Sequence, residues 1–344
     1  MGIKLSPYFY GKIGGLCMKD KVAKMLLSNK GDFISGEELS KKLGVSRTSV
    51  WKYITKLKKE GYEIESISRK GYKLISFPDI LTQTIVEDKL NTEYIGRKII
   101  HYDSVESTNN EVKKIAQKEE EGLIIVAEEQ TKGKGRLGRN WTSPKQKGLW
   151  FSILLKPNIS PSDAPKITQI GAAAISKTIS DIDIKTEIKW PNDIIINSKK
   201  VCGILTEMSG ELNKVNYIVI GIGINVNIDK NEIPNDIKEI ATSLKIEKNN
   251  KIDRRILLAN ILNNFENLYE ELKNNGNINS SIDICRKDSS LIGKKVKVIN
   301  GGKEKIGLAL NINDEGQLLI EYEDGKIENI ISGEISIRGL KGYV

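Results

Sequence analysis

The chain of 344 residues contains little of the chemistry on which many enzymes depend. It has one histidine, His101, and three scattered cysteines, Cys17, Cys202 and Cys285. A single histidine excludes histidine metal clusters and argues against a Ser-His or Cys-His nucleophile. The cysteines are too few and too dispersed for a disulfide framework or a zinc site, and they fit the reducing cytoplasm. We therefore expect chemistry based on cations and carboxylates.

Long apolar runs are also missing. None approaches the roughly 20 residues needed to span a bilayer, and the N-terminus lacks a signal-peptide pattern. We therefore expect a cytoplasmic protein with no membrane partner. Lys and Arg number 54 against 45 Asp and Glu, and the sequence pI is near 9.1. This balance suits a chain that meets polyanions. The length allows two or three domains.

The first seventeen residues lack the pattern of the chain that follows. Apolar residues at helical spacing begin just after Met18, whereas Gly14 and Gly15 lie where their codons could include a ribosome-binding sequence. We therefore expect translation to start at Met18. A peptide covering residues 2–12 in the mass spectrum of the native protein would contradict this.

The next segment, residues 18–78, has the pattern of a winged helix-turn-helix. Ser35 and Glu38 have capping-box spacing, and Ser46 can cap a second, basic helix. Two alternating stretches then predict a two-stranded wing. We expect a dimer of this domain to bind two-fold operator DNA, the alternative being a small helical domain with solvated lysines. The predicted DNA-contacting residues are Arg47, Thr48, Ser49, Lys52, Arg69 and Lys70.

A loop at residues 130–141 alternates cations with glycines and ends on Trp141. Glycine lets backbone N–H groups approach an anion, the cations neutralise it, and an indole offers a stacking face. The pattern indicates a nucleotide site, although charged glycine-rich surface loops are common. Its glycines match G-x-G-x-x-G, but Pro144 follows where a dinucleotide motif needs a helix. A Walker motif fails because Arg139 and Asn140 replace Lys-Ser/Thr.

Residues 81–288 alternate strand-like and helical patterns, which is typical of an α/β domain with a mixed sheet. The predicted strands are 98–102, 122–128, 149–155, 186–189, 193–197, 201–208 and 216–222. The predicted helices are 108–118, 163–180 and 253–274. Residues 289–344 alternate short strands with turns and predict a small SH3-like β-barrel. The fold class expected is a multidomain α+β protein.

Five polar clusters interrupt the central pattern. They are the glycine-cation loop, Glu106–Asn109, Lys189–Asp193, Lys200–Leu205 and Gly221–Asn227. In this order and spacing they resemble the bifunctional biotin–protein ligases, which carry a DNA-binding domain and repress biotin genes. The resemblance extends from about Met18 to the end of the chain. One departure is Lys134, which stands where the family usually has arginine. Lysine keeps the positive charge but cannot donate the two parallel hydrogen bonds of a guanidinium.

The resemblance implies an ATP-dependent, AMP-forming biotin–[acetyl-CoA-carboxylase] ligase. The biotin carboxylate attacks the α-phosphate of ATP, so the site must bring two anions together with preorganised positive charge. The biotinyl-5'-AMP formed is then attacked by a lysine of the biotin carboxyl carrier protein. The glycine-cation loop, if it folds over the adenylate, would favour a homodimer, which makes the adenylate the corepressor.

The resemblance also implies roles for individual residues. Lys200 and Arg136 would be catalytic, and Asp193 would position Mg²⁺. The implied biotin-binding residues are Ser107, Thr108, Asn109, Gln130, Gly133, Lys134, Gly135, Arg136, Lys200 and Gly203. The implied residues for ATP and the adenylate are Arg136, Arg139, Trp141, Asn192 and Asn225. Lys199 is the alternative to Lys200, and Asp193 could merely turn the chain.

Three other functions remain open from the sequence. A lipoate or octanoate ligase of related architecture would use the same adenylation with a different acyl pocket. A repressor could sense biotin without catalysis, although sensing alone would not demand both Arg136 and Lys200. A working ligase could also carry a vestigial DNA-binding domain.

Overall fold

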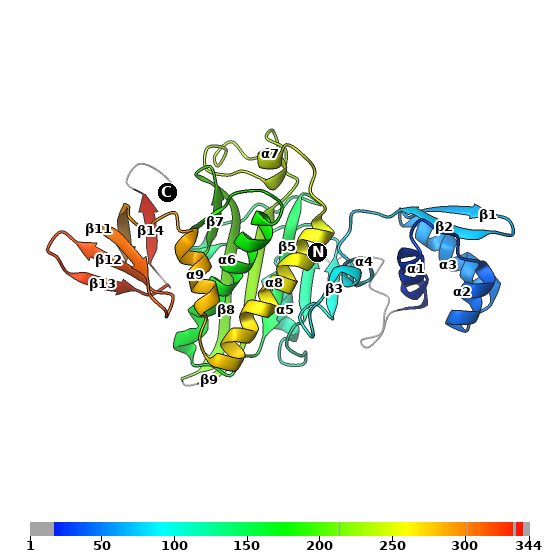
Figure 1. The fold of residues 1–344 in the computed structure, drawn as a ribbon, viewed down its shortest axis with the longest axis horizontal. Helices are drawn as coiled ribbons and strands as arrows, with labels where there is room; N and C mark the ends of the chain where they lie inside the picture. Colours follow the sequence, from blue (N-terminus) through cyan, green and yellow to red (C-terminus); the bar gives the residue numbers. More distant parts are fainter. Residues whose placement is uncertain (1–16, 213, 301, 333–334, 340–344) are drawn as a thin grey trace.

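The computed structural model describes residues 17–212, 214–300, 302–332 and 335–339. The expected start at Met18 concerns residues 1–16, which lie outside the described residues. Figure 1 shows three units in chain order along the long axis of the molecule. A helical unit with a hairpin is followed by a central mixed sheet with helices and then by a smaller antiparallel sheet. The predicted fold class is confirmed.

The N-terminal unit has the predicted caps. Ser35 Oγ accepts from the Glu38 amide at 3.0 Å, and Ser46 Oγ accepts from the Ser49 amide at 3.1 Å. Gly44, in the left-handed region with φ 66°, ends the first of these helices. The elements are α1 (Met18–Ser28), α2 (Gly36–Leu43), α3 (Arg47–Lys59), β1 (Glu63–Ile67) and β2 (Gly71–Ser76), and the two strands pair antiparallel as the predicted wing.

The apolar core of this unit extends beyond residue 78. Ile80 and Ile85, the second of them in α4 (Gln83–Val86), are buried in the same hydrophobic cluster as the three helices. Lys24 of α1 also pairs with Glu87 at 3.1 Å. The segment after the predicted domain boundary therefore completes the core of the N-terminal unit.

The central sheet has seven strands in the order β3-β4-β5-β9-β8-β7-β6. Strands β3 and β4 pair parallel and the other neighbouring strands pair antiparallel, so the predicted mixed sheet is confirmed. The bounds are β3 (Ile99–Tyr102), β4 (Ile124–Ala127), β5 (Gly148–Leu155), β6 (Glu187–Lys189), β7 (Asp193–Ile196), β8 (Lys199–Glu211) and β9 (Lys214–Asn225). Strands β8 and β9 are longer than predicted because they pair with each other both at their polar outer ends and at the buried pairs Gly203–Gly223 and Cys202–Ile224.

Alternate strand residues face two separate cores. Ile124 and Ile153 pack against α6 (Ala164–Ser180) and α8 (Arg254–Asn275), whereas Ile125 and Leu154 pack against α5 on the other face. The bounds of α5 are Thr108–Ile115, somewhat shorter than predicted. The structure adds η2 (Glu87–Lys89), α7 (Leu244–Lys248) and α9 (Asn279–Lys287), which the sequence did not predict, and η4 (Pro161–Asp163) precedes α6 at the start of the predicted helix 163–180.

The C-terminal sheet has five antiparallel strands in the order β13-β12-β11-β10-β14. Trp190 Nε1 of the central domain donates to the Gly316 carbonyl at 2.9 Å, and Arg286 Nε donates to the Ile312 carbonyl at 2.6 Å. These bonds dock the small sheet against the central domain. Its strands are β10 (Lys295–Asn300), β11 (Lys303–Ile312), β12 (Leu318–Tyr322), β13 (Ile327–Ile330) and β14 (Ser336–Gly339), the last of which was not predicted.

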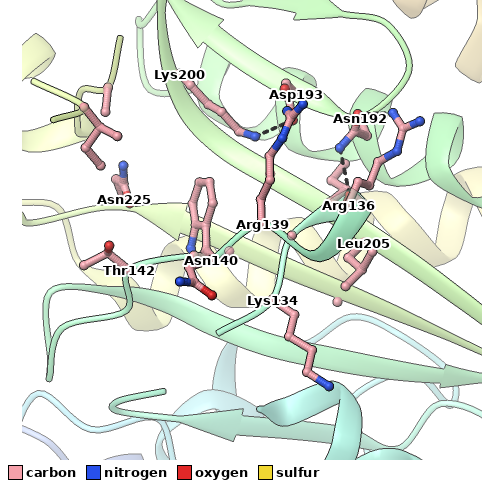
Figure 2. A pocket seen from close by; sticks show the side chains of 18 of the residues that line it. Lys134, Arg136, Arg139, Asn140, Thr142, Asn192, Asp193, Lys200, Leu205 and Asn225 are labelled. Atoms are coloured by element: carbon pink, nitrogen blue, oxygen red, sulfur yellow. Dashed lines mark hydrogen bonds and ion pairs between the residues drawn. The ribbon is translucent and has the colours of Figure 1, made fainter. Parts of the chain in front are cut away.

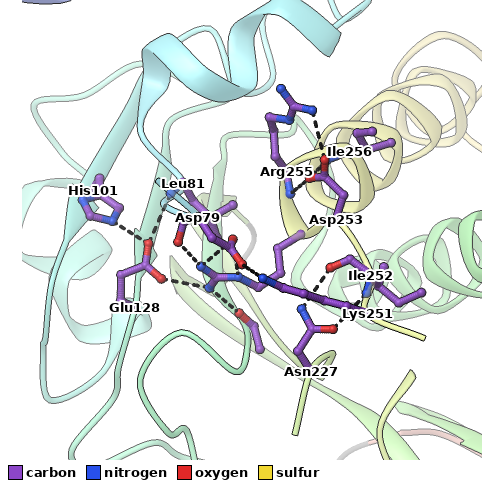
Figure 3. Close-up of polar contacts among 12 residues, drawn as sticks. Asp79, Leu81, His101, Glu128, Asn227, Lys251, Ile252, Asp253, Arg255 and Ile256 are labelled. Carbon is purple, nitrogen blue, oxygen red and sulfur yellow. Dashed lines mark hydrogen bonds and ion pairs between the residues drawn. The ribbon is translucent and has the colours of Figure 1, made fainter. Parts of the chain in front are cut away.

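A buried ionic cluster joins the linker after the N-terminal unit to the central domain (Figure 3). Arg254 is completely buried; it bonds Glu128 at 2.8 Å and Asp79 at 3.0 Å. Glu128 also contacts His101 Nε2 at 2.8 Å and accepts from the Leu81 amide. The one histidine therefore lies in a structural cluster. Among the described residues, no helix is long and apolar enough to cross a membrane.

Candidate active site

The glycine-cation loop lies beside strands β8 and β9. A short turn, η3 (Arg136–Gly138), forms at its tip, and Leu137 there takes a left-handed conformation with φ 56°. The Gly135 amide donates to the Arg139 carbonyl at 2.7 Å and so closes the turn. The residues after the loop form no helix. This agrees with the rejection of a dinucleotide motif.

One cavity of about 690 Å³ gathers the predicted site residues. All the predicted biotin and adenylate residues line it except Gly133, which is packed against the Trp141 carbonyl and Ser143 and so faces away. Lys200 lines the cavity and Lys199 does not. The predicted residues in its lining are Ser107, Thr108, Asn109, Gln130, Lys134, Gly135, Arg136, Arg139, Trp141, Asn192, Asp193, Lys200, Gly203 and Asn225.

Glycines at facing positions of β8 and β9 make room for Trp141. Gly203 pairs with Gly223 in the sheet. A Cβ atom at Gly223 would lie 2.4 Å from the indole Nε1, and one at Gly203 would lie 3.1 Å from the indole ring. Lys200 Nζ is 5.0 Å from the ring centroid on the Gly203 side. Trp141 and Lys200 therefore share one wall of the cavity.

The cations occupy defined positions in Figure 2. Lys200 Nζ pairs with Asp193 at 2.6 Å. Arg136 donates to Asn192 Oδ1 at 2.9 Å and to the Ile335 carbonyl of the C-terminal domain at 3.0 Å. Burial lowers the pKa of the Arg136 guanidinium, and the opposing pull of the Asp193 carboxylate does not cancel this. A partly desolvated cation of this kind attracts an anion more strongly than one in water does.

Lys134 extends away from this group, and its amine lies 3.5 Å from Asn110 Oδ1 (Figure 2). Arg139 is exposed beside the same group. The lysine that replaces the usual arginine is therefore directed toward α5 rather than toward Arg136 and Lys200.

The opposite end of the cavity is a neutral hydrogen-bonding floor. Gln130 Oε1 accepts from the Thr108 amide at 2.9 Å, and Ser152 Oγ lies 2.7 Å from Thr108 Oγ1. Asn109 Nδ2 donates to Glu207 at 2.7 Å, and a Cβ atom at Gly221 would lie 2.1 Å from Asn109 Oδ1. Asn225 is not part of this floor but lies at the Lys200 end: its Nδ2 donates to the Thr242 carbonyl at 2.9 Å, and the Thr242 amide donates to the Lys200 carbonyl at 2.9 Å. The cavity thus has a cationic end and a neutral polar end, which suits a ligand with one anionic and one amide-like end.

Two further cations in the lining were not among the predicted site residues. Lys189, at the end of β6, is 5% exposed, and burial lowers the pKa of its amine to about 8. Arg338 reaches the cavity from β14. Lys189 stands in a cluster that the sequence did single out, but nothing local indicated Arg338, since it lies more than 100 residues from the others.

An apolar wall of the cavity was also missed. It comes from the segment between β9 and α7, which lies over the side of the cavity near Asn225. Its isoleucines recur within an otherwise polar loop, and that recurrence was the available signal. The wall residues are Ile228, Ile233, Pro234, Ile237, Ile240 and Ala241.

The carboxylates of the cavity offer little for a protein-bound metal. No cluster of three or more His, Cys, Asp or Glu side chains suited to a metal exists in the described part of the chain. Asp193, the candidate for Mg²⁺, is paired with Lys200. This fits Mg²⁺ held chiefly by nucleotide phosphates and water, the usual mode for this ion.

The predicted DNA-contacting residues lie on α3 and at the wing. Thr48 and Lys52 are exposed on α3, and the wing-tip residues Arg69 and Lys70 are exposed as well. Arg47 pairs with Glu37 of α2, and Ser49 bonds the cap residue of its own helix. The helix also carries an exposed tryptophan that was not predicted to contact DNA.

Family comparisons cover the three units. The Biotin/lipoate A/B protein ligase family matches residues 102–225, an HTH domain matches residues 19–73, and the Biotin protein ligase C terminal domain matches residues 291–338. The chain is 32% identical to the biotin protein ligase from Aquifex aeolicus solved in complex with biotin and ATP, with a TM-score of 0.63. That alignment covers 71% of this chain and 99% of the other.

Two relatives align with this chain over nearly their whole length. The chain is 41% identical to the bifunctional ligase/repressor BirA of Bacillus subtilis over 91% of this chain and 96% of the relative. It is 29% identical to the bifunctional ligase/repressor BirA of Escherichia coli over 93% of this chain and 99% of that protein. With the cavity and the three matched units, these relationships identify the chain as a member of the bifunctional biotin ligase/repressor family.

Proposed function

We propose that this protein activates biotin with ATP to biotinyl-5'-AMP, transfers the biotinyl group to a carrier-protein lysine, and uses the adenylate as corepressor. The observation that carries the proposal is that one cavity has Arg136 and Lys200 at one end and the Thr108–Gln130 floor at the other. An acid with a neutral ring matches these ends. The biotin and ATP named in the Aquifex aeolicus structure support the choice of ligands.

In the first step, a carboxylate oxygen of biotin attacks the α-phosphorus of ATP. The new bond is an acyl phosphate, and the bond to the bridging oxygen breaks as pyrophosphate leaves. Lys200 and Arg136 stabilise the charge on the two approaching anions, while Asp193 holds the Lys200 amine by their 2.6 Å contact. Mg²⁺ would neutralise phosphate charge when bound, and Asp193 is the residue that would position it.

In the second step, the neutral amine of the acceptor lysine attacks the acyl carbon. The amide forms, AMP leaves with the electrons of the broken acyl–oxygen bond, and the amine proton is released. Arg136 spans Asn192 and the Ile335 carbonyl, so it holds the loop and the C-terminal domain beside the adenylate. This arrangement retains the mixed anhydride until the carrier protein arrives.

The same proposal extends to regulation in the cytoplasm. Adenylate binding would order the glycine-cation loop and promote a homodimer that presents two winged domains to a two-fold operator. Sedimentation with and without biotinyl-5'-AMP tests this coupling. An unchanged dimerisation constant would contradict it.

The ligase reaction is tested by incubating the purified protein with ATP, Mg²⁺ and biotin, with lipoate and octanoate in parallel. Pyrophosphate release is followed first, and then transfer to a biotin-carrier domain. We expect turnover with biotin alone. Turnover with lipoate or octanoate instead would indicate the related ligases, and biotin binding without turnover would indicate a sensor-repressor.

A further inference from the structure

The outward face of α3 carries a large aromatic side chain. Thr48, Trp51, Lys52 and Thr55 follow one another at positions i, i+3, i+4 and i+7, the spacing of neighbours on one helix face. Trp51 is 57% exposed. Protein surfaces contain many small apolar patches. A large indole exposed to water in the middle of α3, however, suggests that this surface contacts a partner.

Packing of the N-terminal unit does not explain why residue 51 is a tryptophan. Val50, Ile54 and Leu57 form the buried stripe of α3 and are 2% exposed or less. Trp51 lies outside the hydrophobic cluster that these residues build with α1 and α2. Replacing it should therefore remove little folding free energy.

Two of the predicted DNA-contacting residues are engaged within the protein. The Arg47 guanidinium pairs with Glu37 of α2. Ser49 is half-buried, and its hydroxyl lies 3.0 Å from Ser46 Oγ at the helix cap. The exposed face is therefore centred further along the helix than predicted, on Thr48, Trp51 and Lys52.

The charges around Trp51 indicate what covers it. Helix α3 has five cations and no acidic residue over Arg47–Lys59. The wing adds exposed Arg69 and Lys70. A face with this charge would repel a basic partner, and a neutral apolar partner would leave its cations unpaired. A polyanion matches it better, and the phosphates that flank the major groove of DNA are such a polyanion. The occupant to which these observations point is duplex DNA.

We propose that Trp51 contacts thymine C5-methyl groups in the major groove and thereby determines part of the operator sequence. This inference rests on the proposed DNA-binding function. The thymine methyl is the apolar group that the major-groove edge presents, and an exposed apolar side chain on a recognition helix can contact it. Lys52 and the wing set the position on the phosphates, whereas Trp51 reads sequence.

The experiment uses the full chain with biotin, ATP and Mg²⁺ and selects binding sites from a randomised duplex pool. Each thymine of the selected duplex is then replaced by uracil, which removes only the C5-methyl group. At one or more thymines per half-site we expect binding to weaken about fourfold, the effect of losing one apolar carbon contact. Trp51→Ala should abolish this uracil penalty at those positions and weaken binding to the thymine duplex at least as much.

Two variants serve as controls. Trp51→Phe should retain part of the uracil penalty because it keeps an apolar ring. Lys70→Ala should weaken binding to selected and random duplexes alike while the penalty persists. Unchanged thermal unfolding of Trp51→Ala would show that the N-terminal unit is intact.

The possible results distinguish a failure of the Trp51 role from a failure of the proposed DNA binding. A full uracil penalty in Trp51→Ala, or unchanged affinity of that variant for the selected duplex, overturns the role of Trp51 and leaves DNA binding standing. Failure of the unmodified chain to enrich any sequence removes sequence-specific DNA binding and the inference with it.

Discussion

At the scale of single residues, Arg136 joins three parts of the chain. It belongs to the glycine-cation loop, bonds Asn192 of the central domain and reaches the Ile335 carbonyl of the C-terminal domain. Its partial desolvation adds to its attraction for phosphate. One side chain thus places a cation in the cavity and ties the loop to the C-terminal domain.

Arg136→Gly should therefore release the reactive adenylate. We expect biotin label on bystander lysines in a mixed-protein assay, rising on the order of tenfold or more, since one contact to a developing charge is commonly worth 1–3 kcal/mol. Lys132→Ala is the matched control because Lys132 is an exposed loop cation that pairs with Glu106 outside the cavity. Unchanged selectivity of Arg136→Gly would refute the closure role.

Lys189 predicts a pH dependence. Burial lowers the pKa of its amine to about 8, below the ordinary value of 10.5. The cavity therefore loses a positive charge as pH rises through about 8, and we expect the KM for ATP to rise several-fold between pH 7 and 9. In Lys189→Arg the rise should be absent, since arginine stays charged. An equal rise in that variant would assign the effect to another group.

The lowered pKa of Lys189 also determines whether the free energy of unfolding rises or falls with pH. Between pH 8 and 10.5 the unfolded chain binds the lysine proton more than the folded chain does, so the Lys189 contribution to the free energy of unfolding rises with pH in this range. Denaturant titrations at several pH values should show the free energy of unfolding of the unchanged protein rising with pH relative to that of Lys189→Met.

At the scale of elements, the start of α8 anchors the linker through Arg254. Its guanidinium bonds Glu128, Asp79 and the Gly148 carbonyl at the start of β5. Burial raises the pKa of Glu128, but the His101 and Arg254 contacts outweigh it and leave the pKa lowered. The stability from this carboxylate is therefore present above its ordinary pKa and is lost on acidification.

Arg254→Met should lower the free energy of unfolding by about 3–5 kcal/mol, because it leaves buried Glu128 without its main counter-charge. Urea denaturation measures the change. Lys251→Met is the control: Lys251 pairs with the same Asp79 at 3.3 Å but is 66% exposed in its side chain, so about 0–1 kcal/mol is expected. Equal losses in both variants would show that burial of the Arg254 cluster is not what matters.

At the scale of the whole molecule, the ligase cavity draws only on residues from Ser107 onward within the described chain. The cavity and the N-terminal unit are therefore separable in their contacts with ligand, but not in their packing. Ile80 and Ile85 complete the N-terminal core, and Asp79 is held by Arg254. The predicted boundary at residue 78 therefore cuts through an apolar cluster.

Deleting residues 1–78 should leave the rate of biotin transfer within about twofold and abolish operator binding. The uncovered Ile80 and Ile85 should lower solubility, and replacing both with threonine in the deletion variant should restore it. Transfer assays and gel-shift measurements on the two variants check this. Loss of transfer in the solubilised variant would mean that the N-terminal unit contributes to ligation.

The sequence by itself determined what depends on neighbouring residues. Ser35 and Ser46 cap their helices as predicted, because a cap bonds an amide only three residues away. Strand and helix periodicity gave most of the elements for the same reason. The motif order was sufficient to predict the family, and every residue predicted to bind biotin or the adenylate, apart from Gly133, lines one cavity.

Only the tertiary structure decided what depends on distant segments. Arg338 enters the cavity from a separate sheet, the isoleucine loop closes the side of the cavity near Asn225, and Ile80 joins the N-terminal core. Arg254 binds Asp79 across 175 positions of sequence. The physical reason is that such contacts form when packed units bury their remaining apolar and charged groups against one another, and no local pattern of residues specifies that partner.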